Sequence, residues 1–329
     1  MLSDEMKNEL ISSAYELSNN IIAEIKKAVS GKNEQIKLLL CALFSGSHVL
    51  IEDVPGTGKT TLALAMSKAA GLSFKRAQFT PDVMASDITG YNMYSKKTES
   101  FEYREGLVHT NVFLADEINR ASPKTQSALL EAMEEMAVTV DGVRYQTPSP
   151  FTVIATQNPS GFVGTYPLPE AQLDRFAIRL SMGYPSRDEE LNILKGRKSS
   201  DPLKSINAAA APEAILACKR AAEEVYVSPS VEEYIVDLVK ATRSCPQLSL
   251  GASPRASLTL MRLSRALAII KNRDHVLPED VVFIYPYAIS HRVVLSRSAR
   301  TENTGTDDVI KSILKTTKIP FLRGKDLRK

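Results

Sequence analysis

One segment, residues 48–62, constrains the fold of this chain more than any other. Its apolar residues Val49 to Ile51 predict a buried strand, a loop with two glycines follows, and an apolar helix then begins. This is the layout of a phosphate-binding P-loop, in which backbone N–H groups and a helix N-terminus surround the β-phosphate. The residues expected to bind the nucleotide are Asp53, Val54, Pro55, Gly56, Thr57, Gly58, Lys59, Thr60 and Thr61.

Two residues of this loop have specific expected roles, and one departs from the general pattern. Lys59 can reach the β- and γ-oxygens of ATP, and the Thr60 hydroxyl can ligate Mg²⁺. Asp53 stands where the pattern Gly-x-x-x-x-Gly-Lys-[Ser/Thr] has its first glycine. Asp tolerates unusual backbone angles, but a carboxylate near phosphates must point away from them. The alternative explanation of the whole segment is a plain Gly/Pro turn between a strand and a helix.

Composition excludes several classes of protein. The 329 residues are enough for two domains, and 43% hydrophobic with 24% charged residues is ordinary for a globular chain. A net charge of +3 is too small to indicate nucleic acid or an anionic membrane as a partner. No apolar run approaches the length of a membrane span, and the polar N-terminus predicts no signal peptide. Three widely spaced cysteines predict reduced thiols in a cytoplasmic protein.

The first half of the chain alternates short apolar strands with helices, which predicts an α/β fold with a parallel sheet between helices. Besides the P-loop strand, strands are expected at residues 73–79, 111–115 and 151–156. Two β-hairpins are expected as insertions, a loosely patterned one at 91–103 and one at 137–147 that turns at Asp141-Gly142.

After Tyr184-Pro185 the pattern becomes helical. Prolines near the helix starts predict a bundle of short helices at residues 187–197, 212–224, 229–244, 254–271 and 278–291. We therefore expect two domains, a nucleotide-binding core at 1–198 and an all-α domain at 199–329, with residues 199–211 as the linker. Basic residues are in excess from Arg255 onward, which indicates a solvated face or, as the alternative, a surface for phosphate or acidic partners.

The chemistry is expected at the carboxyl ends of the strands, where parallel sheets bind their ligands. Asp116 follows four apolar residues and is the expected Mg²⁺ ligand, and Glu117 beside it is the expected base for an attacking water. An Asp-Glu pair alone could equally begin a helix. Asn158 ends another strand, where its amide can orient the water; the alternative is a turn residue before Pro159.

Two arginines complete the expected catalytic set. Arg175 in Leu173-Asp-Arg-Phe176 could supply charge to the transition state from a neighbouring subunit, and such arginine fingers accelerate phosphoryl transfer by roughly 10³–10⁵-fold. The alternative is a surface arginine in an ion pair. Arg255 lies at a predicted helix start, where it is placed to touch the nucleotide and report its state.

Six motifs, in this order, resemble those of a MoxR-type AAA+ ATPase, in the clade of the magnesium chelatases. They are Glu52-Asp-Val-Pro-Gly-Thr-Gly-Lys-Thr60, Phe113-Leu-Ala-Asp-Glu-Ile-Asn-Arg-Ala121, Leu129-Leu-Glu-Ala-Met-Glu-Glu135, Ala155-Thr-Gln-Asn-Pro159, Gly164-Thr-Tyr-Pro-Leu-Pro-Glu-Ala-Gln-Leu-Asp-Arg-Phe176 and Gly251-Ala-Ser-Pro-Arg-Ala256. The resemblance covers nearly the whole chain, from about residue 21 to beyond His291.

The resemblance implies a role for each candidate residue. Lys59 and Thr60 match Walker A, Asp116 and Glu117 match Walker B, Asn158 matches sensor 1, Arg175 the arginine finger and Arg255 sensor 2. It also implies ATP and Mg²⁺ as ligands, a P-loop NTPase core followed by a helical lid, and a homo-oligomeric ring, usually a hexamer. The hairpin at 137–147 resembles the presensor-1 insertion, and residues 87–103 resemble the insertion in the second core helix. Partners in the family often carry a von Willebrand factor A domain.

Three functions fit these observations. The first is a chaperone-like ATPase that hydrolyses ATP in a ring to remodel client proteins or to assist metal or cofactor insertion. The second is a scaffold in which ATP only sets assembly, with little turnover. The third is a nucleic-acid motor, against which stand the absence of an added DNA-binding module and the acidic turn at Asp141.

Overall fold

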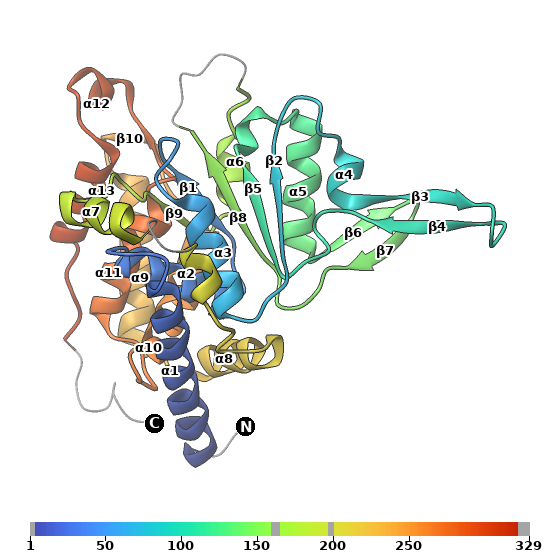
Figure 1. The fold of residues 1–329 in the computed structure, drawn as a ribbon. Helices are drawn as coiled ribbons and strands as arrows, with labels where there is room; N and C mark the ends of the chain where they lie inside the picture. The colour runs from blue at the N-terminus through green and yellow to red at the C-terminus, as the bar shows by residue number, and fades with distance from the viewer. Residues whose placement is uncertain (1–3, 159–164, 197–200, 322–329) are drawn as a thin grey trace.

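A five-stranded parallel sheet forms the centre of the computed structural model, which describes residues 4–158, 165–196 and 201–321 (Figure 1). Its strands follow the spatial order β2-β5-β8-β1-β9. Their bounds are β1 Val49–Glu52, β2 Phe74–Gln78, β5 Val112–Asp116, β8 Thr152–Gln157 and β9 Ile178–Leu180. Four of them were expected from the sequence, and β9 was not.

Helices cover both faces of the sheet, because successive side chains of each strand point to opposite sides. In β1, Val49 and Ile51 join the core formed with α2 (Asn33–Phe44) and α3 (Lys59–Ala69). Leu50 joins the other core, formed with α4 (Ala85–Thr89) and α5 (Pro123–Glu135). Burial on both faces explains why β1, β5 and β8 are mainly apolar.

Two antiparallel hairpins extend from the core, and both expected hairpins are confirmed. One consists of β3 (Gly90–Ser95) and β4 (Ser100–Glu105), which projects far from the rest of the chain (Figure 1). The other consists of β6 (Ala137–Val140) and β7 (Val143–Gln146). Its turn residues have φ angles of 49° at Asp141 and 82° at Gly142, as a two-residue turn with left-handed residues requires. The rings of Tyr103 and Tyr145 stack 3.7 Å apart and join the two hairpins.

The second half is helical, as expected. Its helices are α7 Arg187–Gly196, α8 Pro212–Glu224, α9 Pro229–Ser244, α10 Pro254–Ile270, α11 Pro278–Ile289, α12 Arg297–Thr301 and α13 Thr306–Thr316. A proline opens each helix from α8 to α11, where its missing N–H costs no hydrogen bond. The short helix α6 (Glu170–Leu173), the two-stranded ladder of β10 (Leu248–Leu250) with β11 (Val294–Leu295), α12 and α13 were not predicted.

The N-terminal helices connect the two halves. The long helix α1 (Asp4–Lys26) packs against α8 and α10, and α2 packs against the same two helices. One hydrophobic core therefore runs from the sheet through α2 into the helical half. Helix α2 begins at Asn33, and Lys32 occupies its N-cap position. The expected boundary between residues 198 and 199 lies outside the described residues. Among the helices that the structure describes, none combines the length and the apolar character needed to cross a membrane.

Candidate nucleotide-binding site

The loop between β1 and α3 has the backbone of a phosphate-binding loop. Gly56 and Gly58 have φ angles of 87° and 88°, which side chains rarely permit, while a Cβ at either position would meet no atom within 4 Å. The glycines are therefore needed for backbone conformation and not for space. The loop ends at Lys59, the first residue of α3, whose leading N–H groups have no partner within the helix. Such a helix N-terminus favours an anion.

Lys59 is held inside this loop. Its Nζ donates to the carbonyl oxygens of Asp53, at 2.7 Å, and Val54, at 3.3 Å. Burial lowers the pKa of Lys59, and the nearby charges of Asp53, Asp116 and Glu117 oppose that shift. The ammonium thus lies near the two acidic residues at the end of β5, Asp116 and Glu117.

Asp53 points away from the phosphate-binding side, as the sequence requires. Its Oδ2 accepts from the backbone N–H of Met182 at 2.6 Å and of Gly183 at 2.7 Å, and from the Ser181 hydroxyl at 3.1 Å. Its Oδ1 accepts from the N–H of Val54 at 2.8 Å. The carboxylate that replaces a glycine therefore fixes the P-loop to the segment that follows β9.

Asp116 ends β5, and two neighbouring residues hold its carboxylate. Oδ1 accepts from the Thr156 hydroxyl at 2.6 Å, and Oδ2 forms an ion pair with Arg76 of β2 at 2.7 Å. The Thr156 oxygen also accepts from the backbone N–H of Glu117 at 2.9 Å, so one hydroxyl orients both acidic residues. The sequence does not predict the roles of Thr156 and Arg76, because each contacts Asp116 from 40 residues away in the chain.

Glu117 has a left-handed backbone, with φ 57°. A non-glycine residue in that region costs about 1–3 kcal/mol and is enriched at functional sites. Its Oε2 lies 2.8 Å from Nε of Arg120, in a geometry that forms an ion pair without a hydrogen bond. Both acidic residues are therefore paired with an arginine.

The strand order brings the expected strand ends together. Because β8 lies between β5 and β1, Asn158 directly after β8 is adjacent to both Asp116 and the P-loop. Asn158 is buried, and its carbonyl accepts a long 3.4 Å hydrogen bond from Asn119. The Thr60 hydroxyl and the Asp116 carboxylate are hard oxygen ligands of the type Mg²⁺ prefers. Since Mg²⁺ usually has only one or two protein ligands and takes the rest from phosphates and water, this donor set fits it.

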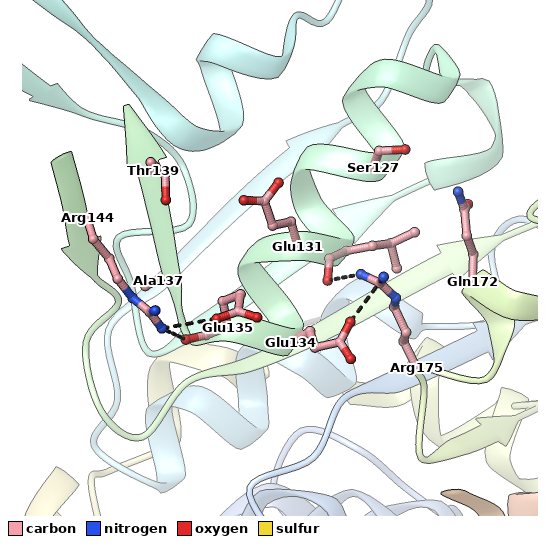
Figure 2. A pocket seen from close by; sticks show the side chains of 10 residues that line it. Ser127, Glu131, Glu134, Glu135, Ala137, Thr139, Arg144, Gln172 and Arg175 are labelled. Atoms are coloured by element: carbon pink, nitrogen blue, oxygen red, sulfur yellow. Dashed lines mark hydrogen bonds and ion pairs between the residues drawn. The ribbon is translucent and has the colours of Figure 1, made fainter. Parts of the chain in front are cut away.

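The two expected catalytic arginines lie elsewhere. Arg175 forms an ion pair with Oε2 of Glu134 at 3.0 Å and donates to the Leu130 carbonyl at 2.7 Å (Figure 2). Arg255, at the start of α10, reaches Oε1 of the same Glu134 at 2.5 Å. In the isolated chain Arg175 thus matches its ion-pair alternative, and Arg255 pairs with the same carboxylate.

A hydrogen bond of His48 shows where Arg175 and Arg255 lie relative to the sheet. The Nε2–H of His48 donates to the carbonyl of Met133 at 2.9 Å, so the end of α5 lies beside the start of β1. Arg175 likewise precedes β9, which is parallel to β1. Glu134 and both arginines are therefore at the amino edge of the sheet, whereas the P-loop, Asp116 and Asn158 are at its carboxyl edge. One chain does not bring the two groups together.

Arg292, which sequence analysis missed, fixes the segment that carries Arg175. This buried guanidinium donates to Asp174 Oδ1 at 2.7 Å and to the carbonyls of Asp174, Phe176 and Ala177 at 3.1, 2.8 and 3.1 Å. Burial lowers the pKa of Arg292, and Asp174 opposes the shift. No local signal could have revealed this contact, since Arg292 and Asp174 are 118 residues apart.

Two cavities lined by described residues lie near the arginines and the end of β1. The larger, of about 500 Å³, is not at the P-loop but on the outer side of α5, lined by acidic residues of that helix together with Arg144 and Arg175 (Figure 2). The smaller, of about 380 Å³, lies between the end of β1, β9 and helices α11 and α13.

Comparison with known proteins gives consistent results. Residues 48–178 match a family described as "ATPase family associated with various cellular activities (AAA)", and residues 240–313 match an AAA lid domain. The chain is 46% identical to protein YeaC of Bacillus subtilis over 94% of this chain and 97% of that protein. It is 39% identical to Chaperone MoxR1 of Mycobacterium tuberculosis over 91% of this chain and 81% of that protein.

A solved structure is similar over almost the entire chain. A crystal structure from Cytophaga hutchinsonii, named as a candidate ATPase, has a TM-score of 0.88 and 35% sequence identity. The similarity covers 96% of this chain and 99% of that one.

Proposed function

The chain belongs to the MoxR family of AAA+ ATPases, and on that basis we propose that it hydrolyses ATP at sites shared between adjacent copies in a ring. The observation that carries this proposal is the position of Arg175 and Arg255 at the opposite edge of the sheet from the P-loop. A neighbouring copy that docks its carboxyl edge against this amino edge would receive both arginines at its nucleotide.

The groups at the carboxyl edge have distinct proposed roles. The N–H groups of the P-loop and the Lys59 ammonium bind the β- and γ-phosphates. Thr60 and Asp116 would hold Mg²⁺, which neutralises charge on the phosphates when bound. Glu117 accepts a proton from the attacking water, and Asn158 orients that water.

The arginines act on the phosphates of the adjacent copy. Arg175 is the proposed arginine finger, worth roughly 10³–10⁵-fold in rate where such residues have been measured. Arg255, from the helical half, is proposed to contact the same nucleotide and to couple its state to the lid. We also propose that the chain divides into a core at 1–198 and a lid at 199–329.

We propose a chaperone-like role, acting on protein clients and with a partner that contains a von Willebrand factor A domain. The chaperone name of the relative from Mycobacterium tuberculosis supports the first part. The projecting hairpin supports client contact, since Tyr94 and Phe101 pair on it while 52% and 73% exposed. Six copies per ring and a cytoplasmic location, where ATP is supplied, complete the proposal.

One observation favours a second candidate, the scaffold in which ATP sets assembly with little turnover. Asp116 and Glu117 are both paired with arginines, Arg76 and Arg120, which must yield before either carboxylate can act. Steady-state phosphate release separates the two functions, because the scaffold releases almost none.

The Glu117→Gln variant tests the proposed chemistry. It should bind ATP as the parent does and release no phosphate above background, since the amide cannot accept the proton. Parental turnover in this variant would remove Glu117 from the mechanism.

Mixed rings test the shared site. Arg175→Ala and Lys59→Ala proteins should each be inactive alone, and their mixture should recover activity, because some junctions then combine an intact P-loop with an intact arginine. A mixture as inactive as its components would argue against a finger that acts on the neighbouring copy.

A further inference from the structure

Glu134 joins two arginines that come from distant parts of the chain. Its Oε2 lies 3.0 Å from Arg175, in the segment before β9, and its Oε1 lies 2.5 Å from Arg255, at the start of α10. Each guanidinium uses its own carboxylate oxygen. One acidic side chain therefore brings together a residue of the nucleotide-binding core and a residue of the helical half.

Electrostatics makes this arrangement depend on the carboxylate. Two guanidinium groups close to each other repel, and an anion between them removes that repulsion. A carboxylate presents two oxygens from one centre, as a phosphoryl group also does, and arginine's planar donors suit both. In the free chain the two guanidinium groups are thus already arranged around a carboxylate, in a way that also suits a phosphoryl group.

Partial exposure makes the contacts exchangeable. The side chains of Arg175, Arg255 and Glu134 are 30%, 45% and 38% exposed. Ion pairs with this exposure are weak, typically about 0–1 kcal/mol each, so a phosphate with greater charge can replace the carboxylate.

We propose that Glu134 is a positioning residue, which holds Arg175 and Arg255 side by side until the phosphates of an adjacent copy's nucleotide replace it. The inference rests on the proposed function, since it assumes that both arginines act across the junction. If Glu134 acts in this way, Arg175 and Arg255 reach the neighbouring site as a pair, because one carboxylate sets the position of both. Misplacement of such groups by about 1 Å can cost on the order of 10²-fold in rate.

The test compares Glu134→Gln with Glu131→Gln in the full-length protein. Glu131 lines the same cavity one turn earlier on α5 and has no ion pair among the residues that the structure describes. Glu134→Gln should lower kcat by about tenfold or more while the KM for ATP changes by less than about threefold, because positioning and not nucleotide affinity is lost. Glu131→Gln should stay within about twofold of the parent.

The mass of the assembly, measured by light scattering, and the melting temperature complete the comparison. Both should be the same for the two variants and the parent. Parental kcat in Glu134→Gln, or a loss of activity that merely follows a loss of assembly, would overturn the proposal.

A double-mutant cycle with Arg255→Ala tests whether Glu134 acts through the arginines. If it does, Glu134→Gln should cost less in the Arg255→Ala background than in the parent, where only its effect through Arg175 remains; fully additive effects would overturn the inference. The outcomes are distinguishable from failure of the proposed function. If the mixed rings recover activity but Glu134→Gln is as active as the parent, only the positioning role of Glu134 is refuted. If Arg175→Ala is fully active, the shared site itself is refuted.

Discussion

Arg76 and Asp116 form an ion pair across two neighbouring strands, with Nη2 of the arginine 2.7 Å from Oδ2 of the acid. The same carboxylate is the proposed Mg²⁺ ligand. The arginine therefore balances the charge of Asp116 in the free chain and would compete for it with the metal.

The Arg76→Gln variant should need less Mg²⁺ to bind ATP. A partly exposed ion pair contributes up to about 1 kcal/mol, so the Mg²⁺ concentration at half-maximal binding should fall by about threefold to fivefold. Titration of Mg²⁺ at a fixed concentration of a non-hydrolysable ATP analogue measures this. Arg104→Gln, which removes a pair with Glu102 on the exposed hairpin, is the control and should change nothing. A higher Mg²⁺ requirement in Arg76→Gln would mean that the arginine assists the metal site.

The Asp53→Asn variant should unfold at lower urea concentration than the parent. The amide keeps one acceptor but places an NH₂ group against the donors of Met182, Gly183 and Ser181. Loss of charged and buried hydrogen bonds predicts a decrease of about 2–3 kcal/mol in the free energy of unfolding. Asp237→Asn, on an exposed position of α9, should stay within about 0.5 kcal/mol. Equal stability of both variants would show that the anchor at Asp53 contributes little.

The Arg292→Lys variant should lose turnover while it still binds ATP. Lysine keeps the charge but cannot reach Asp174, Phe176 and Ala177 together, so the segment that carries Arg175 loses its fixed position. We expect kcat to fall by about tenfold. Arg297→Lys, on the exposed helix α12, should behave as the parent does. Parental kcat in Arg292→Lys would show that this buried contact is not needed to position the finger.

Stability should fall as the pH falls from about 6.5 toward 4, partly because of His48. Burial lowers the pKa of His48 to about 4, and the hydrogen bond from the ring to the Met133 carbonyl only partly opposes that shift. The unfolded chain binds this proton below about pH 6.5 and the folded chain does not, so each pH unit costs up to about 1.4 kcal/mol. Burial also lowers the pKa of His291, so this residue too should reduce stability as the pH falls.

Unfolding free energies at several pH values check this, with His48→Gln as the comparison. In that variant the change of the unfolding free energy per pH unit, between pH 6.5 and 4.5, should be smaller by the contribution of one proton. An unchanged slope would mean that His48 is already protonated in the folded protein.

Much of the fold follows from the sequence, because its signals are local. The strand before the P-loop, the proline-led helices and the Asp141-Gly142 hairpin are each specified by residues close in the chain, and the structure confirms them. The strand β9 has only three residues with Arg179 at its centre, so its sequence shows no apolar pattern typical of a strand. It is a strand because it pairs with β1.

The site was predictable in part for the same reason. Residues at strand ends could be placed from the order of elements, and the structure brings Lys59, Asp116 and Asn158 to one edge of the sheet. Thr156 and Arg292 could not be found, because their partners lie 40 and 118 residues away. The position of Arg255 near Arg175 depends on its ion pair with Glu134 of α5, 121 residues away in the chain, which no local pattern encodes.

The separation of the P-loop and the arginines by one sheet has a numerical consequence for assemblies. In an open row of n chains, the terminal P-loop faces no arginines and the terminal arginines face no nucleotide, so only n − 1 sites are complete. Closing the row into a ring completes the last site without any new contact type. Specific activity per chain should therefore rise with row length and reach its maximum only at closure. A chain that lacks both Lys59 and Arg175 should affect two junctions, one on either side of it, whereas a chain that lacks one of them should affect a single junction.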